Sequence, residues 1–398
     1  MERVRLGTVE IHTEEELVKK IETSLETGTP LRVKQGFDPT APDIHLGHTL
    51  GLSKLRHFQE CGHTVVLIVG DYTGMVGDPS AQAETRRRLT RDEVMKNAET
   101  YLDQFFKVLD REGVEVHYNG TWFKEMSFED VMDLASRYTV AKILARNDFK
   151  ERMAAGRPIS VHEFFYILMQ GYDSVAIRAD VEIGATEQLF NLLAGRDIQM
   201  NYGMEPQVAC TFPVLTGIDG KERMSKSTGN YIGVTESPGV MFGKVMSIPD
   251  ALLPEWLSLL SGWPPGEVER LADPARTNPR DAKERLGRRL VARYHGEKEA
   301  EDAVAEFRKV FSAKGLPEHM PVHKTPGNIW IVRLVKDCGF AASSSEARRL
   351  VKQGAVNLYR GDGGQEKMND PEAQVTLASG DVLRVGKIRF ARLDVEPS

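Results

Sequence analysis

Hydrophobic runs near the start of the chain predict alternating strands and helices. A short apolar run at residues 31–33 is followed by helical spacing over residues 46–59, and then by a continuous β-branched run at residues 64–69. A run of the latter kind is typical of a strand buried on both faces. The pattern therefore predicts a βαβ unit of a parallel sheet. Ligands bind beyond the carboxyl ends of such strands, here residues 36–48 and 70–80.

The later hydrophobic pattern predicts a helical insertion and two further domains. Residues 91–169 are mostly helical in their spacing, and we expect them to form an insertion between two halves of the sheet. Strand-like stretches near Val181 and at residues 207–215 would complete that sheet. We predict an α/β Rossmann-like parallel-sheet domain with this insertion at residues 1–220, a mobile loop at 221–232, an all-α domain at 233–318, a linker at 319–328 and a small α+β domain at 329–398.

Length and composition restrict the class of protein. A chain of 398 residues suits two or three domains. No apolar run approaches the roughly 20 residues that span a bilayer, so we expect no membrane association. The first residues lack the basic start and the apolar stretch of a secretory signal, which predicts a cytoplasmic protein.

The cysteines and the charge distribution add two expectations. Cys61, Cys210 and Cys338 are far apart in the sequence, so neither a disulfide framework nor a metal site is expected. The net charge is −6, yet residues 326–393 carry more Lys and Arg than Asp and Glu. A basic tail on an acidic body either docks a polyanion or is an ordinary solvated surface.

The first candidate for chemistry is His45-Leu46-Gly47-His48, which lies where a loop enters the predicted helix. The N-terminus of a helix presents unpaired N–H groups and the positive end of the helix dipole, so a triphosphate can bind against it. Two histidines there can donate hydrogen bonds to charge that develops on phosphate oxygens, and Gly47 leaves room for an adenine ring. The alternative is a pair of half-exposed histidines at a helix start.

The second candidate is a polar loop at residues 219–230 that contains Met224-Ser225-Lys226-Ser227. Glycines at both ends permit movement, and Lys226 can bring a mobile positive charge to the phosphates as pyrophosphate leaves. By itself the segment is also compatible with a flexible basic linker. Both segments, in this order at the two ends of one α/β region, favour an ATP site.

These two segments resemble the His-x-Gly-His and Lys-Met-Ser-Lys-Ser signatures of the class I aminoacyl-tRNA synthetases. Residues 36–43, 70–80 and 166–173 are further similar to the bacterial tyrosyl-tRNA synthetases of the longer-chain subgroup. Residues 329–393 resemble the RNA-binding domain, named after a small-subunit ribosomal protein, that these enzymes carry at the C-terminus. The resemblance implies a tyrosine-tRNA ligase with a catalytic sheet domain.

The resemblance also implies the substrates and the assembly. The enzyme would convert L-tyrosine and ATP, as its Mg²⁺ complex, to tyrosyl-adenylate and pyrophosphate, and would then transfer the tyrosyl group to the terminal adenosine of tRNA(Tyr). The carboxylate nucleophile is already ionised at neutral pH, so positioning and charge stabilisation must dominate catalysis. The family implies no tightly bound cofactor, and it implies a homodimer formed through the helical region around residues 131–161.

The same resemblance assigns roles to individual residues. The catalytic residues would be Thr40, His45, His48 and Lys226. The ATP-binding residues would be Gly36, Asp38, Gly47, Glu187, Gln188, Met224, Ser225 and Ser227. Tyrosine would be bound by Asp78, Tyr166, Gln170 and Asp173. The candidates for tRNA contact come instead from a basic cluster on a predicted helix, and they are Arg348, Arg349 and Lys352.

The amino-acid pocket also has a physical basis. Tyr166, Gln170 and Asp173 are spaced so that they share one helix face. Apolar flanking residues favour a buried pocket over a solvated polar stripe. In the family, the residues matching Tyr166, Gln170 and Asp78 hold the substrate ammonium group, and the residue matching Asp173 accepts a hydrogen bond from the phenol. A buried carboxylate left without that hydroxyl would disfavour phenylalanine.

Three residues depart from the pattern of the tyrosyl enzymes. Lys34 stands where many of them have a second tyrosine bound to the substrate phenol. Arg223 replaces the first lysine of the second signature, which keeps the charge and changes the donor geometry. Glu187 stands where the family usually places an aspartate on the ribose of the adenylate.

Other interpretations stay open on the sequence alone. A tryptophanyl-type synthetase would share both signatures, although its larger pocket would not need the polar helix face. A catalytically weak paralogue that binds structured RNA is the non-enzymatic alternative. Likewise, the basic cluster at residues 348–352 indicates either contacts to tRNA phosphates or an exposed amphipathic helix.

Overall fold

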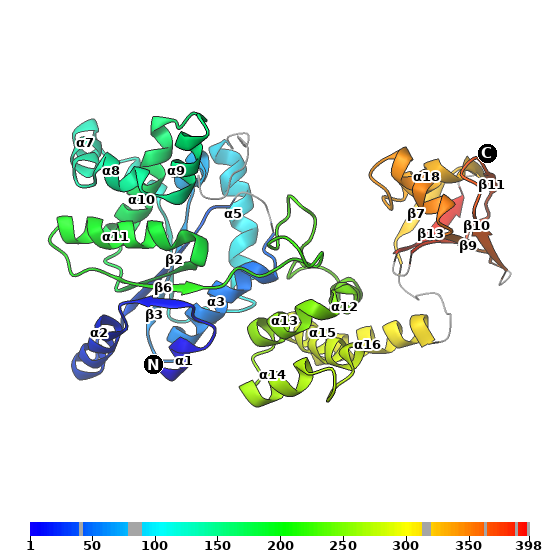
Figure 1. Cartoon of the computed structure of the whole chain (residues 1–398), viewed down its shortest axis with the longest axis horizontal. Coiled ribbons are helices and arrows are strands. Elements are labelled where there is room, and N and C mark those ends of the chain that lie inside the picture. The colour runs from blue at the N-terminus through cyan, green and yellow to red at the C-terminus, as the bar shows by residue number, and fades with distance from the viewer. Residues whose placement is uncertain (40–42, 79–89, 313–319, 362–363, 387–388, 396–398) are drawn as a thin grey trace. The chain divides into compact units, whose positions relative to one another are not determined.

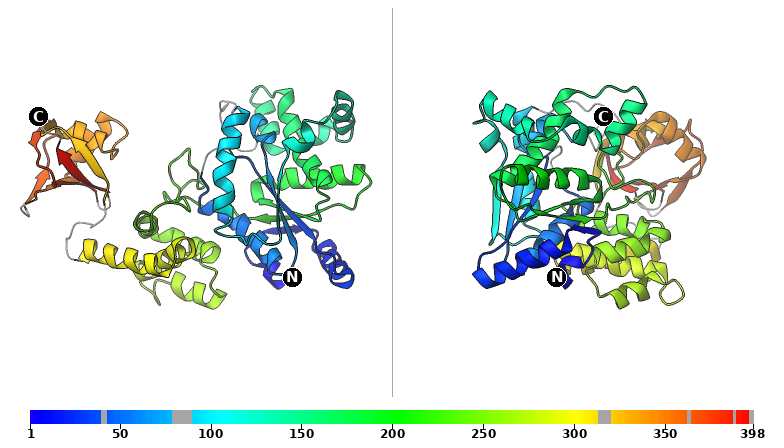
Figure 2. Two further views of the ribbon diagram at one scale, coloured as in Figure 1. Left: turned by 180° about the vertical axis from the view of Figure 1, so that it is seen from behind. Right: turned by 60° about the vertical axis from the view of Figure 1, so that its left-hand side comes forward.

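A computed structural model describes residues 1–39, 43–78, 90–312, 320–361, 364–386 and 389–395 (Figure 1). The chain divides into two compact units, Met1–Glu297 and Lys298–Ser398. Within the first unit a sheet region and a helical region follow one another along the chain (Figure 2). The domain boundaries given above within and between these regions stay predictions.

A six-stranded sheet lies at the centre of the first unit, in the order β1-β6-β5-β2-β3-β4. Its strands are β1 Glu10–His12, β2 Arg32–Phe37, β3 Thr64–Val69, β4 Val114–Tyr118, β5 Val181–Ala185 and β6 Val208–Phe212. All neighbours are parallel except β1, which is antiparallel to β6. The chain proceeds from β2 to its neighbour β3, and the later strand β5 pairs with the other edge of β2. The order of the strands reverses at this point, and such a reversal leaves a crevice at the carboxyl ends of the strands.

The predicted βαβ unit is present in the structure. Helix α3 (Leu46–Gln59) connects β2 to β3, and β3 is buried along nearly all of its length. Helices α10 (Val161–Ala176) and α11 (Leu189–Asn201) lie on one side of the sheet, and α2 (Glu14–Thr27) and α3 lie on the other (Figure 1). Helices α10 and α11 can approach closely because Gly171 has no side chain. A Cβ atom there would lie only 2.4 Å from Ile198 Cδ1.

The region predicted as a helical insertion also contributes a strand. Its helices are α4 Thr73–Val76, α5 Arg91–Phe105, α6 Gly120–Phe123, α7 Phe128–Ser136, α8 Val140–Leu144 and α9 Asn147–Ala154. Residues 114–118, however, form the edge strand β4, so the expectation of a mostly helical segment is wrong there. The strand is short and only half-buried, and it alternates valines with Glu115 and His117 instead of forming a continuous apolar run.

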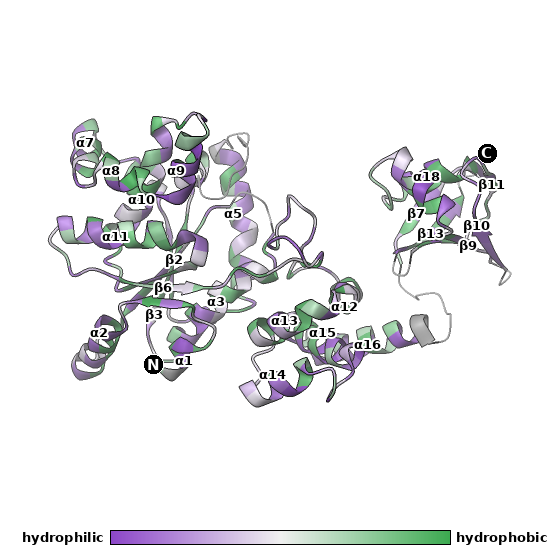
Figure 3. Ribbon diagram, in the orientation of Figure 1, coloured by the Kyte–Doolittle hydropathy of each residue, from purple (hydrophilic) through white to green (hydrophobic). Residues whose placement is uncertain are grey.

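Residues 238–295 form a helical region next along the chain. Its elements are α12 Pro238–Ser247, the 3₁₀ turn η3 Asp250–Leu252, α13 Leu253–Leu260, α14 Pro265–Ala272 and α15 Pro279–His295. Apolar residues form one face of these helices (Figure 3), and Trp256 is fully buried among them. No helix among the described residues is both long and apolar enough to cross a membrane.

The second unit begins with α16 (Glu297–Ser312), which starts at the unit boundary, and continues as a small α+β structure. Its other elements are β7 Val322–Thr325, β8 Asn328–Trp330, α17 Ile331–Asp337, α18 Ser344–Lys352, β9 Val356–Tyr359, β10 Gln365–Met368, β11 Gln374–Thr376, β12 Val382–Val385 and β13 Arg389–Val395. Five strands form one sheet in the order β10-β9-β12-β13-β7, and β8 pairs with β11. Apolar residues of α17, α18 and the large sheet form a single core.

Candidate active site

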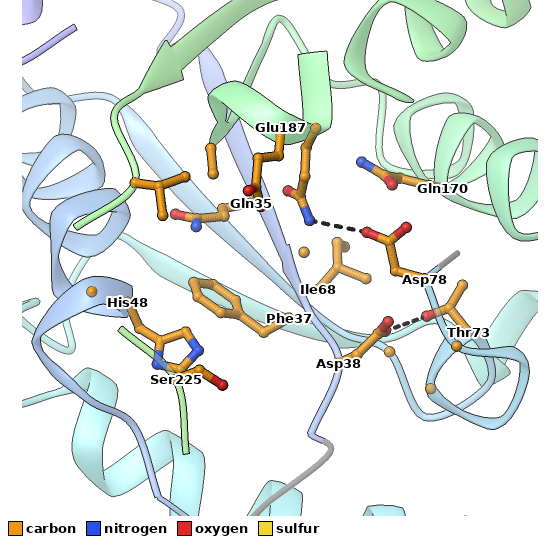
Figure 4. A pocket seen from close by; sticks show the side chains of 18 of the residues that line it. Gln35, Phe37, Asp38, His48, Ile68, Thr73, Asp78, Gln170, Glu187 and Ser225 are labelled. Atoms are coloured by element: carbon orange, nitrogen blue, oxygen red, sulfur yellow. Dashed lines mark hydrogen bonds between the residues drawn. The ribbon is translucent and has the colours of Figure 1, made fainter. Parts of the chain in front are cut away.

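A cavity of about 570 Å³ opens at the carboxyl ends of the parallel strands in the first unit (Figure 4). Every predicted ATP-binding, tyrosine-binding or catalytic residue that the structure describes lines it: Gly36, Asp38, His45, Gly47, His48, Asp78, Tyr166, Gln170, Asp173, Glu187, Gln188, Met224, Ser225, Lys226 and Ser227. Thr40 lies outside the described residues. The predicted tRNA-binding residues lie on α18 of the second unit.

The two histidines of the first signature are stacked at the N-terminus of α3. His45 is the residue before the first helical turn, and the centroids of the His45 and His48 rings are 3.8 Å apart. The backbone N–H of His45 donates to Nδ1 of His48 over 3.1 Å, so a neutral His48 carries its proton on Nε2. A Cβ atom at Gly47 would lie 3.0 Å from the His45 ring, which explains the glycine.

Both histidines are neutral hydrogen-bonding groups at physiological pH. Burial, with the charges of His48 and Lys226, lowers the pKa of His45 to about 2. Burial and the charge of Lys226 lower the pKa of His48 to about 4. A neutral ring still offers one N–H donor, so the pair can donate hydrogen bonds to phosphate oxygens at neutral pH.

The second signature is joined directly to the first. The N–H of Leu46 donates to the carbonyl of Ile232 over 3.0 Å, and the N–H of Val234 donates to the carbonyl of Ile44 over 3.1 Å. The chain that leaves the polar loop thus pairs with the residues that begin α3. The backbone contacts fix one end of the loop beside the histidines.

The polar loop itself is organised around one buried side chain. Nδ2 of Asn230 donates to the Asp219 carboxylate over 3.1 Å and to the Arg223 carbonyl over 3.0 Å. Its Oδ1 accepts from the Ser225 N–H over 2.8 Å. Asn230 therefore holds both limbs of the loop and shapes the segment that presents Lys226.

Lys226 is held by the residue that precedes the first signature. Its Nζ donates to the backbone carbonyl of Asp43 and lies 3.7 Å from Oδ2 of the same residue. Burial lowers the pKa of Lys226, and the neighbouring Asp43 opposes that shift. In this arrangement the ammonium group is at the cavity wall beside His45 and His48.

The opposite part of the cavity contains a connected group of polar side chains. The Tyr166 hydroxyl donates to Asp38 Oδ2 over 2.8 Å, and the Thr73 hydroxyl donates to Oδ1 over 2.8 Å (Figure 4). Burial raises the pKa of Asp38 to about 6, and the two hydroxyl donors oppose the shift. Nearby, Gln188 Nε2 lies 3.5 Å from Asp78 Oδ2, so Asp78 faces the same space.

Asp173 lies on the same helix face as Tyr166 and Gln170, as the spacing predicts, and it is 4% exposed. The indole Nε1 of Trp122 donates to its Oδ1 over 3.0 Å, and Nδ2 of Asn119 donates to its Oδ2 over 3.3 Å. Burial raises the pKa of Asp173 to about 7, whereas Lys34 and the two donors lower it. Each carboxylate oxygen keeps accepting capacity for a ligand hydroxyl.

Comparison with protein families decides the class to which this site belongs. The family described as tRNA synthetases class I (W and Y) matches residues 26–312. The chain belongs to this family. The match spans both phosphate signatures and the polar helix face of this class I synthetase.

Individual relatives extend the similarity over the whole chain. A tyrosine–tRNA ligase of Moorella thermoacetica is 52% identical over 394 residues, which cover 98% of this chain and 94% of the relative. One from Carboxydothermus hydrogenoformans is 47% identical and covers 100% of this chain and 98% of the relative.

Solved structures confirm the predicted fold class. The tyrosyl-tRNA synthetase of Archaeoglobus fulgidus, solved with L-tyrosine, has a TM-score of 0.60 at 22% identity and covers 76% of this chain and 98% of its own. A C-terminally truncated mitochondrial tyrosyl-tRNA synthetase from Aspergillus nidulans has a TM-score of 0.61 at 22% identity, covering 78% of this chain and 92% of its own.

The three departures of this class I synthetase have clear surroundings in the structure. Lys34 is fully buried and is absent from the residues that line the cavity, while its partner Glu182 lines it. Arg223 and Glu187 pair with each other at the cavity wall. Two of the three unusual residues are therefore partners.

Gln35 is a cavity residue of this synthetase that no motif in the sequence indicated. Gln35 lines the cavity, and its Oε1 is buried without a hydrogen-bond partner among the described residues. Its amide packs over Gly51 of α3, where a Cβ atom would lie 2.4 Å from Gln35 Nε2. Successive side chains of a strand point to opposite faces, so Gln35 and Lys34 lie on opposite faces of β2. This alternation is the feature of the sequence that could have indicated Gln35.

Proposed function

We propose that this chain is a tyrosine-tRNA ligase. The observation that carries the proposal is that one cavity brings together the two phosphate signatures and the polar face of α10. In the first step the carboxylate of tyrosine attacks the α-phosphorus of ATP, and the bond to the leaving pyrophosphate breaks. In the second step a hydroxyl of the terminal adenosine of tRNA(Tyr) takes the tyrosyl group and releases AMP.

The phosphate side of the cavity stabilises charge without acid–base chemistry. We assign His45 and His48 as neutral hydrogen-bond donors to the phosphates, at a helix N-terminus that favours anions. We assign Lys226 as the cation that leaves Asp43 for the phosphates when ATP binds. ATP enters as its Mg²⁺ complex, which is the substrate, and the proposal includes no tightly bound cofactor.

The tyrosine side of the cavity recognises the phenol and the ammonium group of the amino acid. We assign Asp173 as the acceptor of the phenol hydroxyl, with Trp122 and Asn119 holding its carboxylate. We assign Tyr166, Gln170 and Asp78 to the ammonium group. Phenylalanine would leave Asp173 buried with an unmet acceptor, which is costly.

Amino-acid-dependent exchange of pyrophosphate with ATP tests the proposal against its alternatives. Exchange that depends on tyrosine and not on tryptophan or phenylalanine is expected. Exchange with tryptophan would support a tryptophanyl-type enzyme. No exchange with any of the three would support an RNA-binding protein without this activity.

The basic cluster of α18 is our proposed tRNA contact. Arg349 and Lys352 are exposed, and Arg348 stacks over the Trp330 ring at 4.9 Å and pairs with Glu372. Two exposed cations one helical turn apart suit phosphate contacts that position an RNA. Replacing Arg349 and Lys352 with Ala should weaken aminoacylation at low tRNA concentration and leave pyrophosphate exchange unchanged. We infer in addition that the enzyme is cytoplasmic.

We also propose that the enzyme is a homodimer formed through the helical insertion. Five apolar side chains of α7 to α10 are exposed, which are Phe128, Met132, Val140, Met153 and Val161. Phe128 is 80% exposed and Val161 is 70% exposed. Several large apolar side chains exposed within one segment of the chain favour a protein contact there.

A further inference from the structure

We propose that the buried ion pair of Lys34 and Glu182 positions Gln170 for the ammonium group of the amino-acid substrate. Both residues act through Gln170, so they are positioning residues. The inference rests on the proposed function, because it concerns the amino acid that the cavity binds.

Lys34 and Glu182 are direct neighbours in the sheet. They are register partners on the parallel strands β2 and β5, so their side chains leave the same face toward α10 and α11. Lys34 is 0% exposed and Glu182 is 1% exposed. The Nζ atom of Lys34 lies 3.1 Å from Oε1 of Glu182.

The ammonium group of Lys34 has three partners within the protein. Besides its ion pair with Glu182, it donates to the backbone carbonyl of Gln170 over 3.1 Å and to the hydroxyl of Ser174 over 2.6 Å. Two hydrogen bonds and one ion pair therefore hold this group inside the protein. Because Gln170 and Ser174 are one turn apart on α10, Lys34 ties that turn of the helix to the sheet.

Glu182 holds the side-chain amide of Gln170 in one orientation. Nε2 of Gln170 donates to Glu182 Oε1 over 3.1 Å, and Oε1 of Gln170 accepts from Asn191 Nδ2 over 3.0 Å. A flipped amide would place its oxygen against the carboxylate and its N–H groups against those of Asn191. The amide oxygen is thus fixed as an acceptor, and it keeps a lone pair for a cation in the cavity that Gln170 lines.

The remaining oxygen of Glu182 accepts from the residue before β6 and from α10. Oε2 accepts from Gln207 Nε2 and from the Ser174 hydroxyl. Gly195 of α11 makes this arrangement fit, because a Cβ atom there would lie 2.6 Å from Gln207 Nε2 and 3.3 Å from Glu182 Oε2. The cluster is packed closely enough to leave the amide of Gln170 little freedom.

Stability alone does not explain this pair. Burying two charges is costly, and an apolar pair of similar volume often gives equal or greater stability. A fixed amide orientation is what the charges provide and an apolar pair would lack. Lys34 itself does not line the cavity, so the recognition of the phenol falls to Asp173.

The test replaces both charges at once, in Lys34→Met with Glu182→Gln, so that neither is left buried alone. Pyrophosphate exchange should show a KM for tyrosine raised by about tenfold, as expected for a charge-assisted contact that is lost, with the KM for ATP within twofold. The decisive measurement is inhibition by desaminotyrosine, which lacks only the ammonium group. At a pH well above 7, where Asp173 is ionised with or without the charge of Lys34, its Ki should be equal in the variant and the wild type.

A merely structural role predicts a different result. General damage to the pocket would weaken tyrosine and desaminotyrosine together, and that outcome overturns the proposal. An unchanged KM for tyrosine overturns it as well. In a Gln170→Ala background the two charge substitutions should have no further effect on tyrosine, because they act through Gln170.

Two further variants make the result unambiguous. Lys283→Met removes a buried lysine of α15 that pairs with Asp250, and it should lower stability without changing either constant for tyrosine or its analogue. Should the double variant not fold, Ser174→Ala removes only the hydroxyl between Lys34 and Glu182. It should raise the KM for tyrosine and not the Ki of desaminotyrosine, and equal effects on both would refute the inference. Absence of tyrosine-dependent exchange in the wild type would instead refute the proposed function.

Discussion

The guanidinium of Arg223 forms an ion pair with the carboxylate of Glu187 at the wall of the cavity. These are two of the three positions at which the chain departs from the usual tyrosyl pattern. The longer glutamate reaches a loop residue, and the planar guanidinium offers it a fork of donors. The two departures therefore compensate each other, and each is explained by the presence of the other.

This pairing predicts coupled effects on ATP binding. Glu187→Asp shortens the carboxylate and Arg223→Lys removes the fork, so either substitution breaks the pair and the second then adds little. In a double-mutant cycle on the KM for ATP, we expect a coupling of about 0.5 kcal/mol, since both side chains are partly exposed and screened. The coupling should fade as salt is raised. Strictly additive effects at low salt would show that the two residues act independently.

Asp173 predicts a pH dependence for tyrosine recognition. Burial raises the pKa of this carboxyl to about 7, so it becomes protonated as the pH falls through neutrality. A protonated carboxyl accepts the phenol less well than a carboxylate does, so kcat/KM for tyrosine should fall below pH 7 toward a limit of tenfold per pH unit. Asp38, whose pKa is raised to about 6, also titrates in this range, so a variant that shifts the pKa of Asp173 alone is the control.

One substitution tests whether the fall of kcat/KM at acidic pH, the acid limb of the pH profile, is due to Asp173. Trp122→Phe removes the indole N–H that favours the ionised carboxyl, so the apparent pKa of the acid limb should move upward. The histidines cannot produce this limb, because burial lowers the pKa of His45 to about 2 and that of His48 to about 4. A limb at the same pH in the variant would assign it to another group.

The helical insertion predicts the state of association. Phe128→Ser with Val161→Ser removes two large apolar side chains from the exposed surface, and sedimentation equilibrium should show a dimer dissociation constant raised by about 100-fold. Leu25→Ser on α2 is the matched control, since Leu25 is 76% exposed and lies outside the insertion. Equal association of both variants would place the contact elsewhere.

The site residues that lie in short continuous segments were predictable from the sequence. His45, Gly47 and His48 form one short segment, and Tyr166, Gln170 and Asp173 are spaced by the helical repeat. The structure brings these six residues to one cavity. The family and the fold class are confirmed by the comparisons.

Contacts between distant segments were not predictable in this way. In the sequence, Lys34 is notable only because many tyrosyl enzymes have a tyrosine at that position. Its partner Glu182 is far along the chain and becomes a neighbour through the pairing of β2 with β5. The pairing of Arg223 with Glu187 brings the polar loop to η2 (Thr186–Gln188), the turn before α11, which is far from the loop in the sequence. Strand β4 was missed because an edge strand needs no continuous apolar run.

Gly70 provides a prediction that links packing to the tyrosine pocket. A Cβ atom at this position would lie 2.1 Å from Asp38 Oδ1 and 2.3 Å from the Thr73 hydroxyl. Asp38 cannot simply rotate away, since it also accepts from Tyr166. Gly70→Ala should therefore break this cluster, destabilise the protein by about 1–3 kcal/mol and raise the KM for tyrosine.

Gly243 gives the opposite expectation for the same substitution. It lies inside α12, has a helical backbone and would place a new Cβ atom in open space. Gly243→Ala should stabilise the protein by about 0.5–1 kcal/mol, because alanine restricts the unfolded chain and favours the helix, with no change in the KM for tyrosine. Urea unfolding of both variants measures the two shifts. A Gly70→Ala variant with wild-type stability and an unchanged KM for tyrosine would contradict the prediction. It would show that the hydrogen bonds of Asp38 to Thr73 and Tyr166 do not require a glycine at this position.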